Sequence, residues 1–285
     1  MNNYAKELRR LLAENKFLTL PGVYDCLSAR IAQEAGFPAL FLSGGALAYS
    51  VLGKPDFGFL SLAEFGDAIQ HIVSACRAPL LADADNAIQA ANTGAVYEQL
   101  GAAGLQIDDK VLPASHPARN EIVDWEMIGP KIQAVRDSVS DDFVIVYRTC
   151  ANLYGYGVEE SIRRINLARE RGADYAYVDG IKSMEELKKI SDEAAIPLMV
   201  NLNEKGFVGG NVPIEEVKAL RYSIGLFPIS SMLAAAQGMI EVMGALADRG
   251  STLSVRDKMT DPPTRIHNMM GQTALVEKYA PYYPL

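Results

Sequence analysis

The feature that most constrains the fold is a regular alternation of short apolar segments with longer amphipathic ones. Eight apolar segments have the length of β-strands, and several are continuous apolar runs, as expected for parallel strands covered on both faces. These candidate strands are Phe17–Val23, Ala39–Ser43, Pro79–Asp83, Gly104–Asp108, Phe143–Arg148, Tyr175–Asp179, Pro197–Asn201 and Ser223–Phe227. Eight alternating units predict a (β/α)8 TIM barrel over residues 1–250. A doubly wound open sheet is the alternative, but the count reaches eight with no change in composition along the chain.

The segments between the strands have helical patterns with suitable boundary residues. Asp25 precedes the first helix as a capping residue, and Pro130 suits the first position of another. The candidate helices are Cys26–Ala35, Leu62–Cys76, Thr93–Leu100, Pro130–Val139, Val158–Arg171, Met184–Ala194, Ile214–Leu220 and Met232–Ala247. Residues 251–285 form a tail that is partly helical in pattern and too apolar to be left in solvent. We expect this C-terminal helical extension to pack on the barrel or on a neighbouring subunit.

Charge and composition exclude several classes of function. The chain has 27 Lys and Arg against 35 Asp and Glu, a net charge of −8, which argues against a nucleic-acid partner. The cysteines lack metal-binding spacing, which indicates reduced thiols in a reducing compartment. The N-terminus lacks an apolar signal core, and no uninterrupted apolar stretch reaches the length of a membrane span. We therefore expect a soluble cytoplasmic protein without a membrane partner.

Acidic residues gather where the predicted strands end. Asp83 and Asp85 follow one apolar run at positions i and i+2, and Asp108 ends the next strand. Carboxylates this close repel one another and are costly to desolvate, and a hard divalent cation with oxygen ligands removes that cost. The active site of a parallel barrel is built from the carboxyl ends of its strands. The sequence therefore predicts a magnesium-type site at that end of the barrel.

Other strand ends supply groups that suit a 2-oxo acid. Arg148 would bind a substrate carboxylate through two parallel hydrogen bonds. Ser43 and the flexible Gly44-Gly45 backbone would donate hydrogen bonds to a carboxylate or enolate oxygen. A metal that chelates the carboxylate and ketone oxygens would then stabilise the enolate left when a neighbouring bond breaks.

Each of these features also has a purely structural interpretation. The aspartate pair would cap the following helix, the arginine would pair with a structural acid, and Ser-Gly-Gly is common in turns after strands. His116 lies in a proline-containing loop, where a histidine is usually solvated. Cys150, two residues beyond Arg148, is either a core residue or faces the substrate.

Several motifs between residues 21 and 204 occur in the order found in one protein superfamily. They are Pro21–Asp25, Ser28–Arg30, Phe41–Gly45, Pro55–Gly58, Ala82–Asp85, Ala103–Asp109, Tyr147–Thr149, Gly172–Asp174, and Asn201 with Glu204. With them the chain resembles the isocitrate lyase / phosphoenolpyruvate mutase superfamily. The resemblance implies a (β/α)8 barrel with a Mg²⁺ site, which makes or breaks a C–C or C–P bond next to a 2-oxo acid carboxylate. It also implies a homotetramer, a dimer of dimers that swap the last barrel helix.

The resemblance further implies roles for individual residues. Asp83 matches the direct metal ligand, with Mn²⁺ as the alternative metal to Mg²⁺. The acids that hold the metal's waters are matched by Asp56, Asp85 and Asp108. The substrate cradle is matched by Ser43, Gly44 and Gly45. The substrate-binding side chains are matched by Arg148 and Asn201.

The chain departs from the superfamily pattern at positions that bear on the reaction. Asn86–Ala90 replaces the glycines that usually follow the acid pair, Asp108 replaces a glutamate, and Cys150 replaces an acid of many members. Isocitrate and methylisocitrate lyases carry a Lys-Lys/Arg-Cys-Gly loop whose cysteine handles a proton, whereas residues 112–120 contain no cysteine. This argues against those two lyases, and the opening Leu112–Ala114 is more similar to the oxaloacetate decarboxylase branch.

These observations predict a magnesium-dependent carbon–carbon lyase, a carboxy-lyase or an oxo-acid-lyase, that acts on a small anionic 2-oxo or 2-hydroxy acid. Oxaloacetate decarboxylation is the leading example, with Tyr24, Ser115 or His116 as the proton donor. One alternative is a phosphonopyruvate or phosphoenolpyruvate mutase or hydrolase that acts on a C–P bond. The other is a barrel that has lost catalysis and binds a metabolite.

Overall fold

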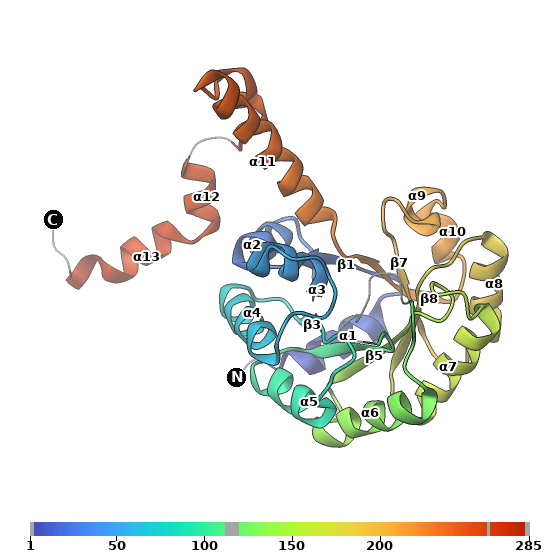
Figure 1. The fold of residues 1–285 in the computed structure, drawn as a ribbon. Helices are drawn as coiled ribbons and strands as arrows, with labels where there is room; N and C mark the ends of the chain where they lie inside the picture. Colours follow the sequence, from blue (N-terminus) through green and yellow to red (C-terminus); the bar gives the residue numbers. More distant parts are fainter. Residues whose placement is uncertain (1–2, 112–119, 261–262, 283–285) are drawn as a thin grey trace.

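The eight apolar runs form a closed barrel of parallel strands, which pair in chain order from β1 to β8 (Figure 1). This computed structural model describes residues 3–111, 120–260 and 263–282. The strands are β1 (Leu18–Val23), β2 (Leu40–Leu42), β3 (Leu80–Asp83), β4 (Gly104–Asp108), β5 (Val144–Thr149), β6 (Tyr175–Val178), β7 (Leu198–Asn201) and β8 (Tyr222–Phe227). The predicted (β/α)8 TIM barrel is confirmed, and the alternative of an open sheet is wrong because β8 pairs with β1.

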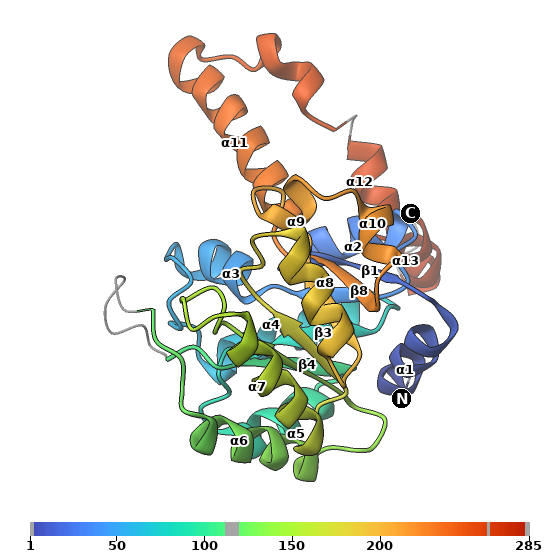
Figure 2. The same cartoon turned by 90° about the vertical axis from the view of Figure 1, so that its right-hand side faces the viewer.

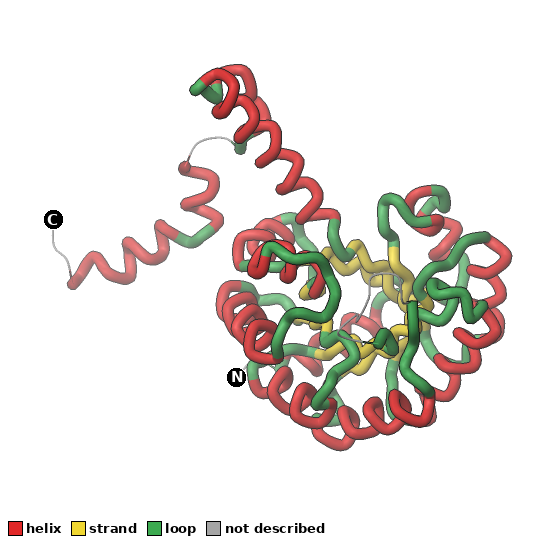
Figure 3. The backbone as a smooth tube through the Cα atoms, in the orientation of Figure 1, coloured by secondary structure: helices red, strands yellow, loops and turns green. Residues whose placement is uncertain are grey.

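A ring of helices surrounds the strands (Figure 3). Its members are α2 (Cys26–Glu34), α4 (Leu62–Ala75), α5 (Ala90–Gln99), α6 (Trp125–Ser138), α7 (Val158–Glu170), α8 (Met184–Glu193) and α10 (Ile214–Lys218). Asp25 caps α2 as predicted, because its side chain accepts a hydrogen bond from Ser28 N. The prediction for Pro130 is wrong, since α6 begins five residues earlier and contains it. Trp125 starts this helix and packs against the ring of Tyr147.

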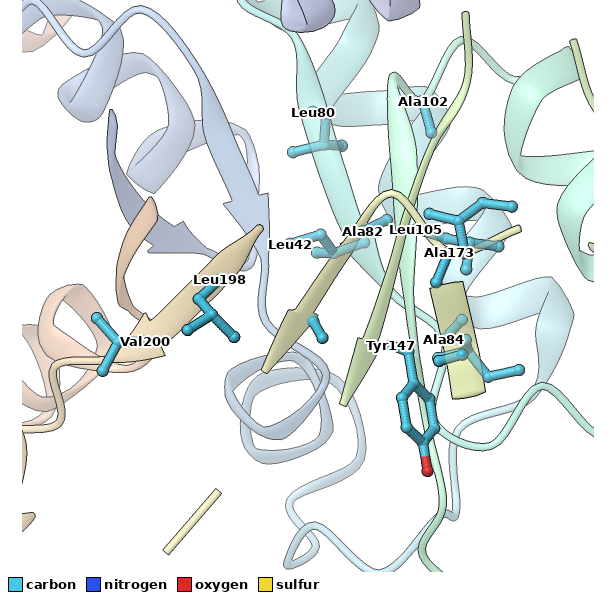
Figure 4. Packing of buried hydrophobic residues seen from close by; sticks show 14 of the residues in the cluster. Leu42, Leu80, Ala82, Ala84, Ala102, Leu105, Tyr147, Ala173, Leu198 and Val200 are labelled. Carbon is cyan, nitrogen blue, oxygen red and sulfur yellow. The ribbon is translucent and has the colours of Figure 1, made fainter. Parts of the chain in front are cut away.

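Two apolar layers lie on opposite sides of the strands. In β3, Leu80 and Ala82 belong to the layer between barrel and helices, part of which Figure 4 shows, whereas Leu81 belongs to the layer inside the barrel. In β5, Ile145 is in the outer layer and Val146 in the inner one. Side chains alternate along a strand. A residue two positions beyond an inner-layer residue therefore points into the barrel mouth.

Helix α1 (Tyr4–Glu14), which the sequence did not predict, covers the amino ends of the strands (Figure 2). Its Leu8 and Leu11 join the inner apolar layer. Arg9 donates hydrogen bonds to the carbonyls of Asp142 and Phe143, just before β5, and forms an ion pair with Asp174 at 2.9 Å. One end of the barrel is thus sealed by apolar side chains.

Short helical segments shape the loops at the other end. After β2 the chain forms α3 (Gly44–Leu47), followed directly by the π-helix η1 (Ala48–Leu52). Another turn, α9 (Phe207–Gly210), follows β7. These segments were not predicted, because they are shorter than the window over which a helical pattern can be recognised.

The chain leaves the barrel after β8 and forms a C-terminal arm, residues 230–260 and 263–282, whose long first helix projects away from the barrel and whose later part lies beside α2 (Figures 1 and 2). The arm contains α11 (Ser230–Arg249), η2 (Leu253–Lys258), α12 (Pro263–Met269), α13 (Gln272–Tyr279) and η3 (Ala280–Tyr282). The predicted helical extension is therefore present. The swapping of a helix between subunits and the division at residue 250 stay predictions.

Candidate active site

Strand register brings a layer of polar side chains to the open end of the barrel. Five side chains lie two positions after inner-layer residues and so point into the mouth: Ser43, Asp83, Arg148, Asp179 and Asn201. Asp108 is the register partner of Arg148 on the neighbouring strand β4. The carboxyl ends of the strands therefore carry acids, an arginine and an amide around one opening, where barrel enzymes place their chemistry.

Asp83 is held by the backbone on both of its carboxylate oxygens. Gly44 N donates a hydrogen bond to Oδ2 at 3.3 Å, and Asp85 N donates to Oδ1 at 3.2 Å. A Cβ atom on Gly44 would lie 2.9 Å from Asp83 Oδ2, closer than real Cβ atoms come. Residue 44 must therefore be glycine for α3 to approach Asp83 this closely.

The predicted substrate cradle is an ordered helical turn and not a flexible segment. Ser43 caps α3, because its Oγ accepts a hydrogen bond from Ala46 N at 3.3 Å. A Cβ atom on Gly45 would lie 3.3 Å from Asp56 Oδ2, so the predicted water-holding acid Asp56 lies beside this turn. The turn thus connects the cradle to two of the predicted metal-site acids.

Asp85 and Asp108 face a lysine. Lys110 Nζ lies 3.1 Å from Asp108 Oδ2 and 3.8 Å from Asp85 Oδ1. Lys110 N also donates a hydrogen bond to Asp108 Oδ1 at 3.0 Å. Its side chain is only 11% exposed. The sequence placed Lys110 next to the acids, but only the structure shows that its ammonium group lies between two of them.

Burial makes these carboxylates costly to ionise without a cation. Burial raises the pKa of Asp83 to about 6, and burial together with the charge of Asp83 raises the pKa of Asp85 well above its usual range. Apart from their ion pairs with Lys110, Asp85 Oδ1 and Asp108 Oδ2 have no hydrogen-bond partner among the described residues. Oxygen-rich sites with this imbalance suit a hard divalent cation.

The predicted metal-site acids do not form a set of three direct ligands. Within residues 3–111, 120–260 and 263–282, no three His, Cys, Asp or Glu side chains could hold a metal ion together. Mg²⁺ takes one or two carboxylates directly and keeps several waters, so direct binding by Asp83 alone is compatible with this arrangement.

Arg148 is positioned by its neighbours and keeps part of its hydrogen-bonding capacity. Its guanidinium group forms an ion pair with Asp179, and its central carbon lies 5.3 Å from the centre of the Tyr177 ring. Burial raises the pKa of Asp179, but the charge and hydrogen bond of Arg148 oppose this, and the pKa is lowered overall. Arg148 Nε is buried and has no hydrogen-bond partner among the described residues. Sequence analysis did not assign Asp179 a role, although its strand-end position was visible.

Three side-chain amides also have buried oxygens without a partner. Asn86 Oδ1, Gln106 Oε1 and Asn201 Oδ1 accept no hydrogen bond from the described residues. Asn201 lines a cavity of about 200 Å³ together with Asp179 and Phe207. Gln106 was missed by sequence analysis, since it lies within an apolar strand and not at its end. It is the register partner of Asp83.

The three candidate proton donors differ in what the structure shows. Tyr24 follows β1 at the mouth, and burial and the neighbouring Asp25 carboxylate raise the pKa of its hydroxyl. It is therefore protonated at neutral pH, as a donor must be. Ser115 and His116 lie outside the described residues.

Cys150 belongs to a buried structural cluster. It packs with Ile122 and Ala151, and burial raises the pKa of its thiol well above the usual range. Its backbone N donates a hydrogen bond to Asp109, a fully buried acid that also forms an ion pair with Arg164. Of the two interpretations of Cys150, the structure favours the core residue.

The segment after Asp83 keeps a glycine-like backbone without the glycines. Asp85 and Ala87 have φ angles of 47° and 43°, in the left-handed region that glycine favours. A non-glycine residue in this region is strained by about 1–3 kcal/mol, and such strain is concentrated at functional sites. The loop that begins at the acid pair therefore contains two strained backbone positions.

Comparison with known proteins places the chain in a family. Residues 8–243 match the sequence model of phosphoenolpyruvate phosphomutase. The chain belongs to this family. The resemblance expected from the motifs is thereby confirmed.

Several members of this group are similar along most of their length. The 2,3-dimethylmalate lyase of Eubacterium barkeri is 33% identical over 267 residues, which cover 90% of this chain and 91% of that protein. A solved oxaloacetate acetylhydrolase with the inhibitor 3,3-difluorooxalacetate has a TM-score of 0.89 and 31% identity, covering 98% of this chain and 97% of that one. A solved phosphonopyruvate hydrolase with oxalate and Mg²⁺ has a TM-score of 0.87 and 25% identity, covering 99% of both chains.

Proposed function

We propose that this protein is a Mg²⁺-dependent lyase that cleaves a C–C bond next to the carboxylate of a 2-oxo or 2-hydroxy acid. Oxaloacetate is the leading substrate. The observation that carries the proposal is the pairing, across one barrel mouth, of the backbone-anchored Asp83 with the partly unsatisfied Arg148. The first suits a metal and the second an anion, and a 2-oxo acid presents both kinds of partner.

One group of residues would hold the metal, and another would bind the substrate. Asp83 would hold Mg²⁺ or Mn²⁺ directly, and the acids that hold its waters would be Asp56, Asp85 and Asp108. When bound, the metal would polarise the substrate's oxo group and offset the negative charge that develops there. Arg148 would bind and orient the substrate carboxylate, with Asp179 fixing the direction of its guanidinium group.

Groups at the rim of the barrel mouth would donate the proton that the product needs. After bond cleavage an enolate needs one proton at carbon, and Tyr24 is protonated and lies at the end of β1. Ser43 and the α3 turn would orient the substrate oxygens. Asn201, with its unpaired oxygen, would accept a hydrogen bond from a hydroxyl or a protonated carboxyl of the substrate.

Similarity to a phosphonopyruvate hydrolase supports the second candidate, cleavage of a C–P bond. The same metal and arginine would serve a phosphonate. The strained loop after Asp83, in which the usual glycines are replaced, motivates the third candidate, a barrel that binds a metabolite without converting it.

A substrate panel with and without Mg²⁺ tests these candidates. Oxaloacetate, 2-hydroxy di-acids and phosphonopyruvate would be incubated with purified protein, and products would be followed by NMR. Pyruvate and CO2 from oxaloacetate indicate decarboxylation, whereas oxalate and acetate indicate hydrolytic cleavage. Phosphonopyruvate turnover alone selects the C–P enzyme. Mg²⁺ binding without any turnover selects the non-catalytic barrel.

The C-terminal arm supports a homo-oligomer, and we propose a tetramer of two helix-swapped dimers. One face of α11 exposes Leu233, Ile240 and Met243, and the barrel helix α2 exposes Leu27 and Ile31. An α11 from a second copy would cover the exposed side chains of α2. Among the described residues, α11 is the one helix long and apolar enough to cross a membrane. Its charged Glu241 and its place directly after β8 favour a protein partner, and a cytoplasmic location stays a prediction.

A further inference from the structure

Lys110 is a buried cation inside the acidic cluster and has no part in the function proposed above. Its Nζ lies 3.1 Å from Asp108 Oδ2 and 3.8 Å from Asp85 Oδ1. Both of these acids belong to the group expected to hold a metal's waters. The positive charge of the lysine therefore interacts with the same acids that a divalent cation would use.

The backbone around Lys110 fixes where its ammonium group can lie. Lys110 N donates to Asp108 Oδ1 at 3.0 Å, and Lys110 O accepts from Asn86 Nδ2 at 3.0 Å. Lys110 also forms an antiparallel bridge with Ile122. These contacts tie the residue to β4, to the loop after β3 and to a third segment. A lysine anchored in this way is not a mobile surface cation.

The charges around the mouth explain why a lysine is useful there. Asp56, Asp83, Asp85 and Asp108 would place four negative charges in a small volume. Arg148 is already paired with Asp179. Without a metal, Lys110 is the nearest positive charge to Asp85 and Asp108 in the described chain, and it reduces their mutual repulsion.

We propose that Lys110 is a built-in counter-ion that holds the acidic cluster together before metal binds and thereby weakens the affinity for the metal. This inference rests on the proposed metal site. A unit positive charge a few ångströms from a divalent cation opposes its binding by about tenfold even at the dielectric constant of water. An anionic substrate would offset that repulsion, so metal and substrate would bind more tightly together than separately.

Lys110 is a positioning residue and not a proton donor. Its ammonium group lies between the carboxylates of Asp108 and Asp85, at 3.1 Å and 3.8 Å. Its effect on the site is electrostatic.

The test compares Mg²⁺ binding by calorimetry in the full-length wild-type protein and in Lys110→Met, which keeps the chain length and removes the charge. The expected result is about tenfold tighter Mg²⁺ binding by Lys110→Met, together with a lower melting temperature of the metal-free variant. Lys110→Arg, which keeps the charge, should bind Mg²⁺ with wild-type affinity and gives a second comparison if Lys110→Met fails to fold. The matched control is Lys188→Met, which removes the charge of an exposed lysine on α8.

The outcomes separate this inference from the proposed function. Mg²⁺ binding that is tighter in Lys110→Met but not in Lys188→Met supports the counter-ion role, because mere structural damage would weaken binding. Unchanged or weaker Mg²⁺ binding in a folded Lys110→Met overturns the counter-ion role, and so does tighter Mg²⁺ binding by Lys110→Arg. In either case, Mg²⁺ binding by the wild type would still support the proposed metal site. If neither wild type nor Lys110→Met binds Mg²⁺ or Mn²⁺, the metal site and the counter-ion role are both wrong.

Discussion

Asp83 shows how a single buried carboxylate couples metal binding to pH. Burial raises the pKa of Asp83 to about 6 in the metal-free protein. A folded-state pKa above the unfolded one means that the folded state holds the proton more tightly. The contribution of Asp83 to the stability of the metal-free protein is therefore largest below about pH 4 and is lost as the pH rises through about 6.

The same shift predicts the pH dependence of Mg²⁺ affinity. Only the ionised carboxylate binds metal, so protons compete with Mg²⁺ below about pH 6. Calorimetry over about pH 5 to 8 should show a plateau at the upper end and a loss of about tenfold in affinity per unit below pH 6. An affinity that is constant from about pH 5 to pH 7 would contradict the assignment of Asp83 as ligand.

Arg148 gives a second prediction at the scale of one side chain. Arg148→Lys keeps the charge opposite Asp179 but loses the planar fork that binds a carboxylate through two hydrogen bonds. We expect kcat/KM for the 2-oxo acid to fall by at least about tenfold, mainly through KM, with Mg²⁺ affinity nearly unchanged. A variant with wild-type KM would show that Arg148 is a structural partner of Asp179 only.

At the scale of elements, the site depends on a close approach of α3 to β3. Gly44→Ala would place a methyl group 2.9 Å from Asp83 Oδ2 and 3.3 Å from the Phe65 ring. Because the neighbours include a side chain fixed by two backbone hydrogen bonds, Asp83 would have to move. We expect Mg²⁺ affinity to fall at least about tenfold and stability to fall by about 1–3 kcal/mol, measured by calorimetry and urea unfolding.

Gly45→Ala is the matched comparison for that substitution. Its methyl group would lie 3.3 Å from Asp56 Oδ2, a contact that a small shift relieves. The loss of Mg²⁺ affinity should therefore be smaller than for Gly44→Ala. Equal effects of the two substitutions would mean that the close approach of α3 to Asp83 does not matter for the metal.

Those elements could be predicted that are marked by a pattern of neighbouring residues in the sequence. Continuous apolar runs marked the strands, and acids or an arginine directly after them marked Asp83 and Arg148 as mouth residues. The roles of Gln106, Lys110 and Asp179 depend on which way a side chain points and what faces it across the barrel. That information comes from strand register, which a single sequence pattern does not contain.

For the whole molecule, the exposed apolar face of α11 predicts assembly. Ile240 is 67% exposed and Met243 is 61% exposed. Ile240→Glu would place a charge in the proposed subunit contact, so sedimentation should show smaller species than the tetramer proposed for wild type. Ala234→Glu adds the same charge on the face of Gln237 and Glu241 and should leave the tetramer intact. A wild-type protein that sediments as a monomer would contradict the swapped-helix proposal.

The barrel as a whole combines a sealed apolar end with an acidic mouth, and the account depends on that mouth being a metal-dependent catalytic site. The most direct measurement is oxaloacetate turnover, with and without Mg²⁺, by wild type, by Asp83→Ala, and by Asp67→Ala, which removes an exposed acid on α4. We predict that wild type and Asp67→Ala lose activity with a chelator and regain it with Mg²⁺, and that Asp83→Ala is at least about 100-fold less active at any Mg²⁺ concentration. Full activity in Asp83→Ala, or turnover by wild type that is indifferent to Mg²⁺ and chelator, would contradict the account.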